Sequence, residues 1–409
     1  MNGNKYISRL LNVVAVSVVA GVMFTSCIGD GGETIPLEYQ SKPATSTDIP
    51  SDDEATPNPS IDTSTATSIL PNFGDAIVEE NNGDMIAELY MPGLKCPGDD
   101  DRWLYLVGTG GKNMLEQNVW VSVDGTPKGC VALNNANGEV KKPVPFDFVF
   151  LVDNSGNMNV VGDIIARDLT SWGAELKGYN LDVKYGSVGY GRLEKVDAEV
   201  GVNGAKDICD LADLNSYLTR ENRAGVMRTK GYLTSEPTLQ TFSANKYSNC
   251  SGVCPVEALK YADEAFSFRR AACRVYLNFL DEANQPGGSF LWSVESVRDA
   301  NVWRAYQGTV HTVYNGLRNF LEESLSYEYP WKLSTYTGGT SELDFDRAMT
   351  NVYLNKLTVT KVMRYSYVLR FRVLPSCLDD KAHDVRITVR SQNGEVLADK
   401  NFYVTFSRK

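Results

Sequence analysis

The sequence predicts an α/β fold with a doubly wound parallel sheet, flanked on both sides by β-rich segments. Residues 145–356 alternate apolar, strand-like runs with amphipathic, helix-like stretches, which is typical of parallel sheets with helical crossovers. Residues 73–144 and 357–409 instead show period-two alternation and frequent turn signals. We therefore expect the two flanks to fold together into one β-sandwich, with the α/β domain inserted between them.

Residues 1–26 have the pattern of an export signal. A basic head with Lys5 and Arg9 precedes an apolar stretch, 10–24, that is too short for a comfortable membrane span. Small residues then lead to Cys27, an arrangement that resembles the lipobox of bacterial lipoproteins. The resemblance implies cleavage before Cys27 and its acylation, which anchors the chain at a bacterial outer membrane or cell surface. The alternative is an ordinary signal peptide that contains a cysteine.

Residues 27–72 are rich in Ser, Thr, Pro, Asp and Gly. A segment with so few large apolar side chains cannot bury enough surface to fold on its own. We therefore expect residues 27–72 to be a disordered, solvated linker that holds the folded part away from the membrane.

The two flanking segments carry alternating strand patterns. In the first flank, Val119, Val121 and Val123 share one face, and Asp124-Gly125 is a typical hairpin turn. In the second flank, apolar and polar residues alternate over 385–390, before an Asn-Gly turn and a last strand near 402–406. Both flanks therefore favour antiparallel β structure.

The α/β segment begins with a nearly continuous apolar run at 146–152, as expected for a strand covered on both faces. A helix follows, because apolar residues recur at helical spacing from Val161 to Leu176. Further strands are predicted at 181–190, 275–280 and 309–314, and helices at 255–270, 290–306, 342–355 and within 207–230.

Net charge and cysteines limit the functional classes. The net charge is −11, which argues against nucleic acid as a partner because that partner requires a basic surface. There are eight cysteines, and setting Cys27 aside leaves an odd number, so at least one stays unpaired within the chain. Cys273 opens an apolar run and is our candidate for a buried free thiol.

Disulfides are permitted after export, but several pairings are open. Cys250 could close a small loop with Cys254, or one of the two could reach Cys209. With only two histidines in the chain and no pair of zinc knuckles, we do not expect a zinc site. The remaining candidate pairings join Cys96 to Cys130 or to Cys377.

Carboxylates follow two of the predicted central strands. Asp153 comes after the first strand, and Asp281 comes directly after the strand at 275–280. Ligands of open parallel sheets bind beyond the carboxyl ends of the strands. Asp153, Ser155 and Asn157 place three oxygen-bearing side chains on one turn, which suits a hard divalent cation. The alternative is that Asp153 and Ser155 only cap the following helix.

The same residues resemble a known family. FVFLVDNSGNM is similar to the start of a von Willebrand factor A domain, and LDVKYGSVGYG, RVYLNFLDE and YPWKLSTYTGGTSEL resemble its later elements in the right order. The resemblance covers about 145–355 and implies a Rossmann-like fold with a metal-ion-dependent adhesion site. It also implies that Asp281 completes that site.

Two departures from the family pattern make the site degenerate. Asn157 stands where the family has a second Ser. The slot of the family's Thr falls near Val253, and Ser251 is the nearest hydroxyl. The resemblance therefore implies that Mg²⁺ or another divalent cation is held by Asp153, Ser155, Asn157, Asp281 and Ser251.

Other motifs lack the residues that their chemistry requires. Residues 108–112 have the wrong glycine spacing for a phosphate loop, and residues 153–164 have Met158 where a calcium-binding loop needs Gly. His311 and His383 lie away from any nucleophile motif, so we expect structural roles for both. No carboxylate pair has a spacing typical of acid–base catalysis, and we predict that the protein is not an enzyme.

These observations favour a membrane-anchored lipoprotein that binds a protein or matrix ligand and acts in adhesion or recognition. The alternative is a non-catalytic structural subunit of a surface or envelope assembly, for example at a pilus tip, with no functional metal. In both cases the partners are proteins and the membrane, reached through the lipid on Cys27.

Overall fold

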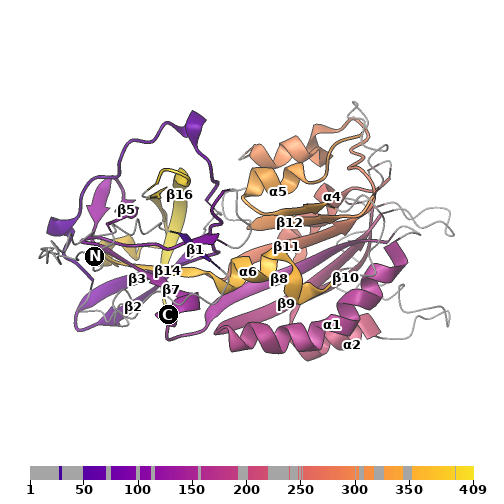
Figure 1. The fold of residues 1–409 in the computed structure, drawn as a ribbon, viewed down its shortest axis with the longest axis horizontal. Coiled ribbons are helices and arrows are strands. Elements are labelled where there is room, and N and C mark those ends of the chain that lie inside the picture. Colours follow the sequence, from indigo (N-terminus) through magenta and orange to yellow (C-terminus); the bar gives the residue numbers. More distant parts are fainter. Residues whose placement is uncertain are drawn as a thin grey trace, which may run out of the picture.

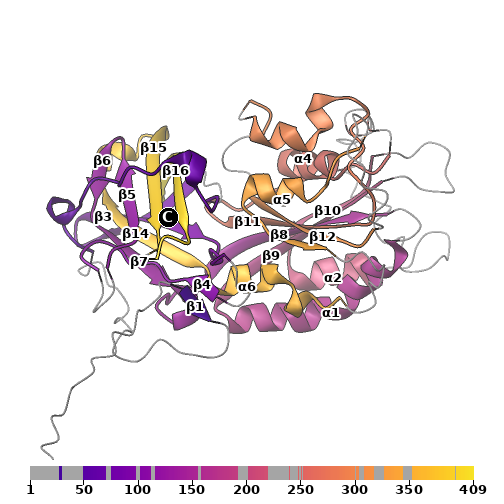
Figure 2. The same cartoon turned by 45° about the horizontal axis from the view of Figure 1, so that its top comes forward.

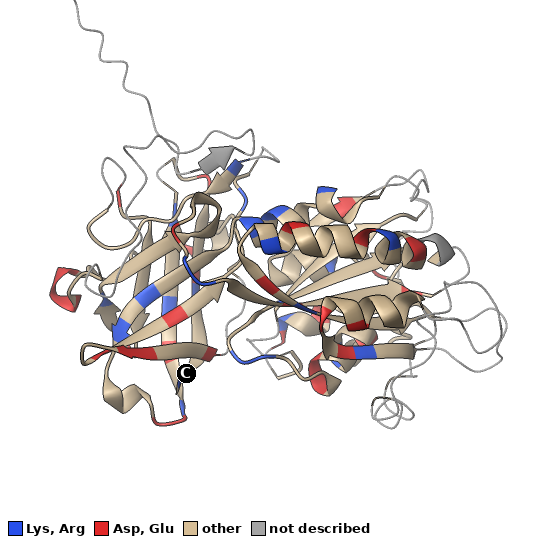
Figure 3. Ribbon diagram, turned by 90° about the horizontal axis from the view of Figure 1, so that it is seen from below, with Lys and Arg blue, Asp and Glu red and all other residues tan. Residues whose placement is uncertain are grey.

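The computed structural model divides into a β domain, which carries the C-terminus, and an α/β domain beside it (Figure 1). Both contain strands, which form an eight-stranded sheet in the first domain and a six-stranded sheet in the second. Acidic and basic residues are interspersed over both domains (Figure 3). The structure describes residues 27–29, 49–70, 75–97, 102–111, 116–154, 158–191, 201–219, 239, 247, 250, 252–299, 301–303, 308–316, 327–343, 352–391 and 393–409.

The β domain combines strands from both flanks of the chain. Its strand order is β6-β5-β15-β16-β2-β3-β14-β7, in which β16 and β2 are parallel and the other pairs are antiparallel. A separate short pair joins β1 (Cys27–Gly29) to β4 (Arg102–Leu104). The eight strands are β2 (Asp75–Asn81), β3 (Asp84–Met91), β5 (Val119–Val123), β6 (Thr126–Lys128), β7 (Cys130–Asn134), β14 (Tyr367–Val373), β15 (Ala382–Arg390) and β16 (Leu397–Arg408).

The predicted union of both flanks is therefore present, but the predicted sandwich is wrong. All eight strands belong to one sheet that curves around a single apolar core. The curvature brings β7 back toward β5, so that Cys130 Sγ lies 3.8 Å from the carbonyl oxygen of Val119. Strand twist accumulates along a long sheet whose inner face is buried. The sheet therefore nearly closes into a barrel and does not form the two packed sheets of a sandwich.

The six-stranded sheet of the α/β domain has the order β10-β9-β8-β11-β12-β13. Neighbouring strands are parallel, except that β10 is antiparallel to β9 at one edge. β8 alternates its side chains between two cores, one on each face, which explains its continuous apolar run. The strands are β8 (Val144–Asp153), β9 (Leu181–Tyr190), β10 (Val202–Cys209), β11 (Cys273–Leu280), β12 (Thr309–Tyr314) and β13 (Ser341–Leu343).

Helices cover both faces of this sheet (Figure 2). On one face lie α1 (Asn159–Gly178) and α2 (Leu211–Thr219), and α6 (Thr358–Arg364) packs beside α1 before the chain enters the β domain. On the other face lie α4 (Pro255–Ala265) and α5 (Lys332–Thr337). Trp172 of α1 is buried against Phe148 and Phe150 of β8 and ties the helix to α6 by a 2.9 Å hydrogen bond to Thr360 Oγ1.

One predicted helix differs from the structure, and another lies largely outside the described residues. The stretch 290–306 contains two 3₁₀ turns, η8 (Phe290–Trp292) and η9 (Val294–Arg298), in place of one helix. The Glu328 carboxylate accepts hydrogen bonds from the Ser293 hydroxyl (2.6 Å) and the Val294 amide (2.8 Å), so a distant residue interrupts the helix. Within 342–355 the structure has the end of β13 and the start of the 3₁₀ turn 354–356, and residues 344–351 lie outside the described residues.

Residues 49–70, expected to belong to the disordered linker, lie along the β domain. Asp52 forms an ion pair of 2.8 Å with Lys128, and Asn58 Nδ2 donates to Thr388 Oγ1 at 2.9 Å. Leu70 is buried, and Gly129 lacks a side chain where a Cβ would lie 2.2 Å from the carbonyl oxygen of Pro50. The expectation was wrong for 49–70 because hydrogen bonds to the sheet replace the apolar surface that the segment lacks.

The predicted signal peptide, 1–26, lies outside the described residues, and so does the side chain of Cys27. Among the residues that the structure describes, no helix has both the length and the apolar character needed to cross a membrane. The lipid anchor on Cys27 therefore stays a prediction from sequence.

Candidate functional site

The candidate site lies where the strand order of the α/β sheet reverses, between β8 and β11. The chain leaves β8 for a helix on one face, and the segment after β11 packs on the opposite face. Adjacent crossovers that diverge in this way leave a crevice at the carboxyl ends of the strands, which is where ligands of such sheets bind. Asp153 is the last residue of β8, and Asp281 directly follows β11.

Both carboxylates are almost completely buried. Asp153 is 1% exposed and Asp281 is 4% exposed. Burial raises the pKa of Tyr190, the register partner of Asp153 on β9, and the charges of Asp153 and Asp281 add to this effect. The Tyr190 hydroxyl donates to Asn278 Oδ1 at 2.6 Å. The two acids therefore share one polar, water-poor environment with a phenol that stays protonated.

Two glycines let the backbone approach these acids. Gly191 has a φ of +104°, and a Cβ there would lie 2.7 Å from Asp153 Oδ1. A Cβ on Gly316 would lie 2.0 Å from the carbonyl oxygen of Asp281. At both positions the wall of the site is formed by backbone, because a side chain there would collide with Asp153 or Asp281. Buried carboxylate oxygens in such a cradle are donors that fit a hard divalent cation.

The structure brings two of the five predicted metal ligands to the same edge of the sheet, Asp153 and Asp281. Ser155, Asn157 and Ser251 lie outside the described residues, so their predicted roles remain predictions. Sequence inspection did not single out Tyr190, Asn278 or Gly191. Their contribution depends on strand neighbours that are far apart in the sequence.

We expect Gly191→Ala to destabilise the fold and to weaken cation binding. The positive φ is strained for any L side chain, which costs about 1–3 kcal/mol, and the new Cβ also crowds the Asp153 carboxylate. Gly394→Ala is the matched control, because Gly394 has a φ of +75° but a Cβ there would meet no atom within 4 Å. Thermal unfolding with and without Mn²⁺ measures both effects. Equal losses of stability and unchanged Mn²⁺ binding in both variants would contradict the proposed role of Gly191 beside Asp153.

The cysteines next to this site form a cluster. Cys254 is the N-cap residue of α4, and its thiol, the Cys250 thiol and the Glu257 carboxylate lie with their ligand atoms within 4.8 Å of one another. All three residues are buried. Cys250 and Cys254 are free thiols here, so the suggested disulfide between them is not formed. Hydrogen bonding with Cys254 and burial raise the pKa of the Cys250 thiol.

The other suggested disulfides are not formed either. Cys209 packs on the α1 face of the sheet, whereas Cys250 and Cys254 belong to the core on the α4 face, so the sheet separates them. Cys130 and Cys377 carry free thiols, which excludes a bond from either to Cys96 in this structure. The sixth described thiol behaves as predicted: Cys273 is buried and free.

His311 and His383 have different surroundings. Burial lowers the pKa of His311 to about 3, and its Nδ1 lies 2.8 Å from Thr340 Oγ1, so the ring is neutral. His383 of β15 lies between two acids: Nδ1 is 2.8 Å from Asp124 Oδ2, and Nε2 is 3.2 Å from Asp379 Oδ1. The Cys377 thiol is close to this group, but both ring nitrogens of His383 already face carboxylates. That arrangement is typical of a protonated imidazole and not of a metal ligand.

We expect His383→Gln to lower stability in a pH-dependent way. The hydrogen bond with Asp124 raises the pKa of His383 above its usual 6.5, and a raised histidine pKa stabilises the fold fully below the unfolded-state pKa. This contribution is lost as the pH rises through the folded-state pKa. Urea unfolding of wild type and variant from about pH 5 to about pH 9 should show a difference that shrinks with rising pH. A difference independent of pH would contradict the ion-paired histidine.

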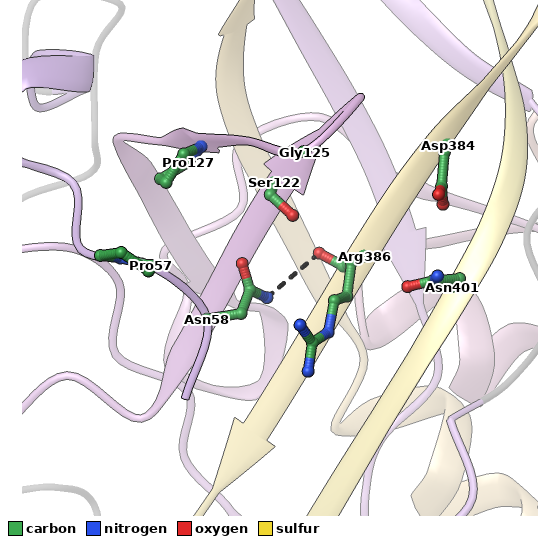
Figure 4. Close-up of a pocket in the computed structure, with 8 residues that line it drawn as sticks. All are labelled: Pro57, Asn58, Ser122, Gly125, Pro127, Asp384, Arg386 and Asn401. Carbon is green, nitrogen blue, oxygen red and sulfur yellow. Dashed lines mark hydrogen bonds between the residues drawn. The ribbon is translucent and has the colours of Figure 1, made fainter. Parts of the chain in front are cut away.

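A separate pocket of about 270 Å³ lies on the β domain (Figure 4). It is bounded by Pro57 and Asn58 on one side and by β5, β15 and β16 on the other. The Arg386 guanidinium forms a bidentate ion pair with Asp399 of β16 (2.8 and 2.9 Å), so its charge is compensated within the sheet. The other polar groups around the pocket are the Asp384 carboxylate and neutral Asn and Ser side chains, and we assign no chemistry to it.

Comparisons with known proteins do not identify a family. No family model matches the chain, and no curated protein matches it. Among solved structures, a proximal thread matrix protein from the mussel byssus has 11% identity and a TM-score of 0.30, and covers 57% of this chain and 48% of its own. The PilB minor pilin from Streptococcus sanguinis has 8% identity, a TM-score of 0.31, and coverages of 71% and 76%.

The pilus adhesin SpaC from Lactobacillus rhamnosus GG has 9% identity and a TM-score of 0.30, with 80% of this chain and 54% of that protein covered. This chain thus spans about half the length of the mussel protein and of the adhesin. Likenesses of this size establish neither the fold family nor the function. Any assignment of function therefore depends on the residues at the carboxyl ends of β8 and β11.

Proposed function

We propose that the chain is a lipid-anchored envelope protein that binds a protein or matrix ligand through a divalent cation in its α/β domain. In this proposal the domain is of the von Willebrand factor A type, and the cation is Mg²⁺ or a similar hard ion. The protein is non-catalytic and acts in adhesion or recognition at the bacterial outer membrane or cell surface.

The observation that carries the proposal is the position of Asp153 and Asp281. They end the two central parallel strands at the point where the strand order reverses, and both are buried. Carboxylate oxygens are the donors that a hard divalent cation prefers, and its remaining coordination positions can accept water or a carboxylate from the ligand.

The strand order supports the family assignment within this proposal. A parallel sheet of order 3-2-1-4-5-6, counted from β8 as the first strand, is one of the common doubly wound arrangements. The antiparallel edge strand β10 and helices on both faces accompany it. The four sequence segments that resemble the family fall on β8 and the N-cap residue of α1, on β9, on β11, and on α5 with β13.

Calorimetric titration of the purified chain with Mg²⁺ and with Mn²⁺ tests the proposal. We expect saturable binding at one site in the wild type and a large loss in Asp281→Asn. Asp213→Asn, on the exposed side of α2, is the matched control and should bind as the wild type does. If neither ion binds to the wild type, the cation-dependent function is wrong, and the structural-subunit alternative gains support. Protease treatment of intact cells tests the exposure of the chain at the cell surface.

A further inference from the structure

A second group of possible metal ligands lies at the start of α4. It consists of Cys250, Cys254 and Glu257, whose two sulfurs and one carboxylate oxygen all lie within 4.8 Å of one another. Cys250 is 5% exposed, Cys254 is 1% exposed and Glu257 is 0% exposed. The three groups therefore converge in the protein interior, away from bulk water.

The helix accounts for the convergence of two of these groups. Cys254 is the N-cap of α4, Pro255 occupies the first turn, and the Glu257 amide donates to the Cys254 carbonyl at 3.1 Å. Residues three apart on a helix lie on the same side, so Glu257 stands over Cys254. Cys250 reaches the same point from the preceding loop. α4 is packed on β8, β9 and β10, so the sheet positions Cys254 and Glu257.

The donor atoms of the cluster suit a cation. Two thiols and a carboxylate are all acids, and burying them together in ionised form is unfavourable unless a positive charge lies among them. Lys260 is one turn further along α4, but its ammonium donates to the Leu291 carbonyl and to Ser296 Oγ. It also lies over the ring of Trp292, 5.6 Å from the centroid. Lys260 is therefore hydrogen-bonded to the η8–η9 segment, and its charge also interacts with Cys254 and Cys250.

We propose that Cys250, Cys254 and Glu257 bind a single thiophilic divalent ion of the zinc type. Thiolate sulfur binds Zn²⁺ at about 2.3 Å and carboxylate oxygen at about 2.0–2.2 Å, so donors already within 4.8 Å of one another need only small movements. Each thiol loses its proton to solvent when the ion binds. Three protein ligands leave the fourth tetrahedral position to water.

This site is distinct from the proposed adhesion site. Two sulfur donors favour zinc over magnesium, whereas the buried carboxylates at Asp153 and Asp281 favour hard ions. It also revises our expectation from the cysteine spacing, because the third ligand is a glutamate that no cysteine motif includes. An ion here would link Cys250 to the start of α4. Tyr190 is close to this position, because Cys254 contributes to its raised pKa.

Cobalt substitution of the whole chain tests the proposal. The reduced, chelator-treated protein is titrated with Co²⁺, and a thiolate-to-cobalt absorption band reports sulfur ligation. We expect one equivalent per chain, displacement by Zn²⁺, and loss of the band in Cys254→Ser. Glu257→Gln keeps both thiols and should weaken Co²⁺ binding at least about tenfold. Cys209→Ser, on the other face of the sheet, is the control and should titrate as the wild type does.

Two outcomes would overturn the proposal. One is the absence of a thiolate band at one equivalent of Co²⁺ while both thiols remain reduced by thiol titration. The other is a native proteolytic peptide that contains both Cys250 and Cys254 and is two hydrogens lighter than the same peptide after reduction. That second result would show that an external disulfide oxidant has accepted the two electrons and two protons of the thiols, and that the pair forms a disulfide instead of a metal site. Neither result would bear on Mg²⁺ binding by Asp281, so failure of this site and failure of the proposed function are distinguishable.

Discussion

The Asp153→Asn variant is expected to bind Mn²⁺ more than about 100-fold more weakly than the wild type. Loss of groups that only support metal ligands costs about 10–100-fold, and Asp153 is proposed as a ligand itself. Asparagine has nearly the same shape as aspartate, so the contact of this side chain with Gly191 is kept and the negative charge is removed. Because Asp153 is 1% exposed, the variant is also unfolded thermally without the ion, which separates a loss of binding from a loss of stability.

The measurement combines calorimetry with thermal unfolding. A ligand at about 100 times its dissociation constant stabilises the native state by about 2.7 kcal/mol, so Mn²⁺ should raise the unfolding temperature of the wild type and leave that of Asp153→Asn unchanged. Asp163→Asn is the control, because Asp163 lies on the exposed side of α1. Undiminished Mn²⁺ binding by Asp153→Asn would show that the cation lies elsewhere.

Replacement of Arg269 by methionine is expected to cost about 3–5 kcal/mol of unfolding free energy. Arg269 compensates Asp147, a residue of β8 that is 0% exposed. Its Nε lies 2.6 Å from Asp147 Oδ1, its backbone amide lies 2.6 Å from Oδ2, and its Nη1 lies 2.6 Å from Asp182. Breaking a buried pair by removing one partner leaves an uncompensated charge, which is far more costly than the pair itself is stabilising.

The pH dependence of this loss has a defined sign. Burial raises the pKa of Asp147 even with Arg269 present, and removing Arg269 raises it further. An acid whose pKa is higher in the folded state favours folding as the pH falls, so the deficit of Arg269→Met should shrink toward acid pH. Urea unfolding at several pH values checks this.

The control is Arg298→Met. Arg298 pairs with Glu295 at 3.1 Å, but its side chain is 64% exposed, so the expected loss is between 0 and about 1 kcal/mol. Equal losses for the two arginine variants would contradict a special role for burial at Asp147. A double variant, Asp147→Asn with Arg269→Met, should recover part of the stability because the buried charge is absent.

Much of the α/β domain could be predicted because its strands are local patterns. The runs at 181–190 and 309–314 coincide with β9 and β12, and 146–152 lies within β8. Long stretches of apolar residues have few alternatives to a doubly covered strand. The positions of Asp153 and Asp281 at strand ends follow from these strand bounds. The sequence alone therefore located the edge of the sheet on which the proposed site stands.

Other features depend on contacts between residues that are distant in the sequence. The helix expected at 290–306 is interrupted because Glu328 accepts hydrogen bonds that would otherwise belong to the helix. Residues 49–70 are ordered because Asp52 and Asn58 find partners on β6 and β15. The composition of a segment indicates how much apolar surface it can bury. It does not indicate which distant strands can offer it hydrogen bonds or ion pairs.

By itself, the sequence determined the alternation of strands and helices, the union of the two flanks, and the acids that end β8 and β11. Only the tertiary structure decided that the flanks form one curved sheet, that the sheet separates Cys209 from Cys250, and that Glu257 joins the two cysteines at α4. The physical reason is the range of the interactions. Periodicity reflects the burial of each residue within its own element, whereas strand curvature and ligand clusters depend on which elements become neighbours.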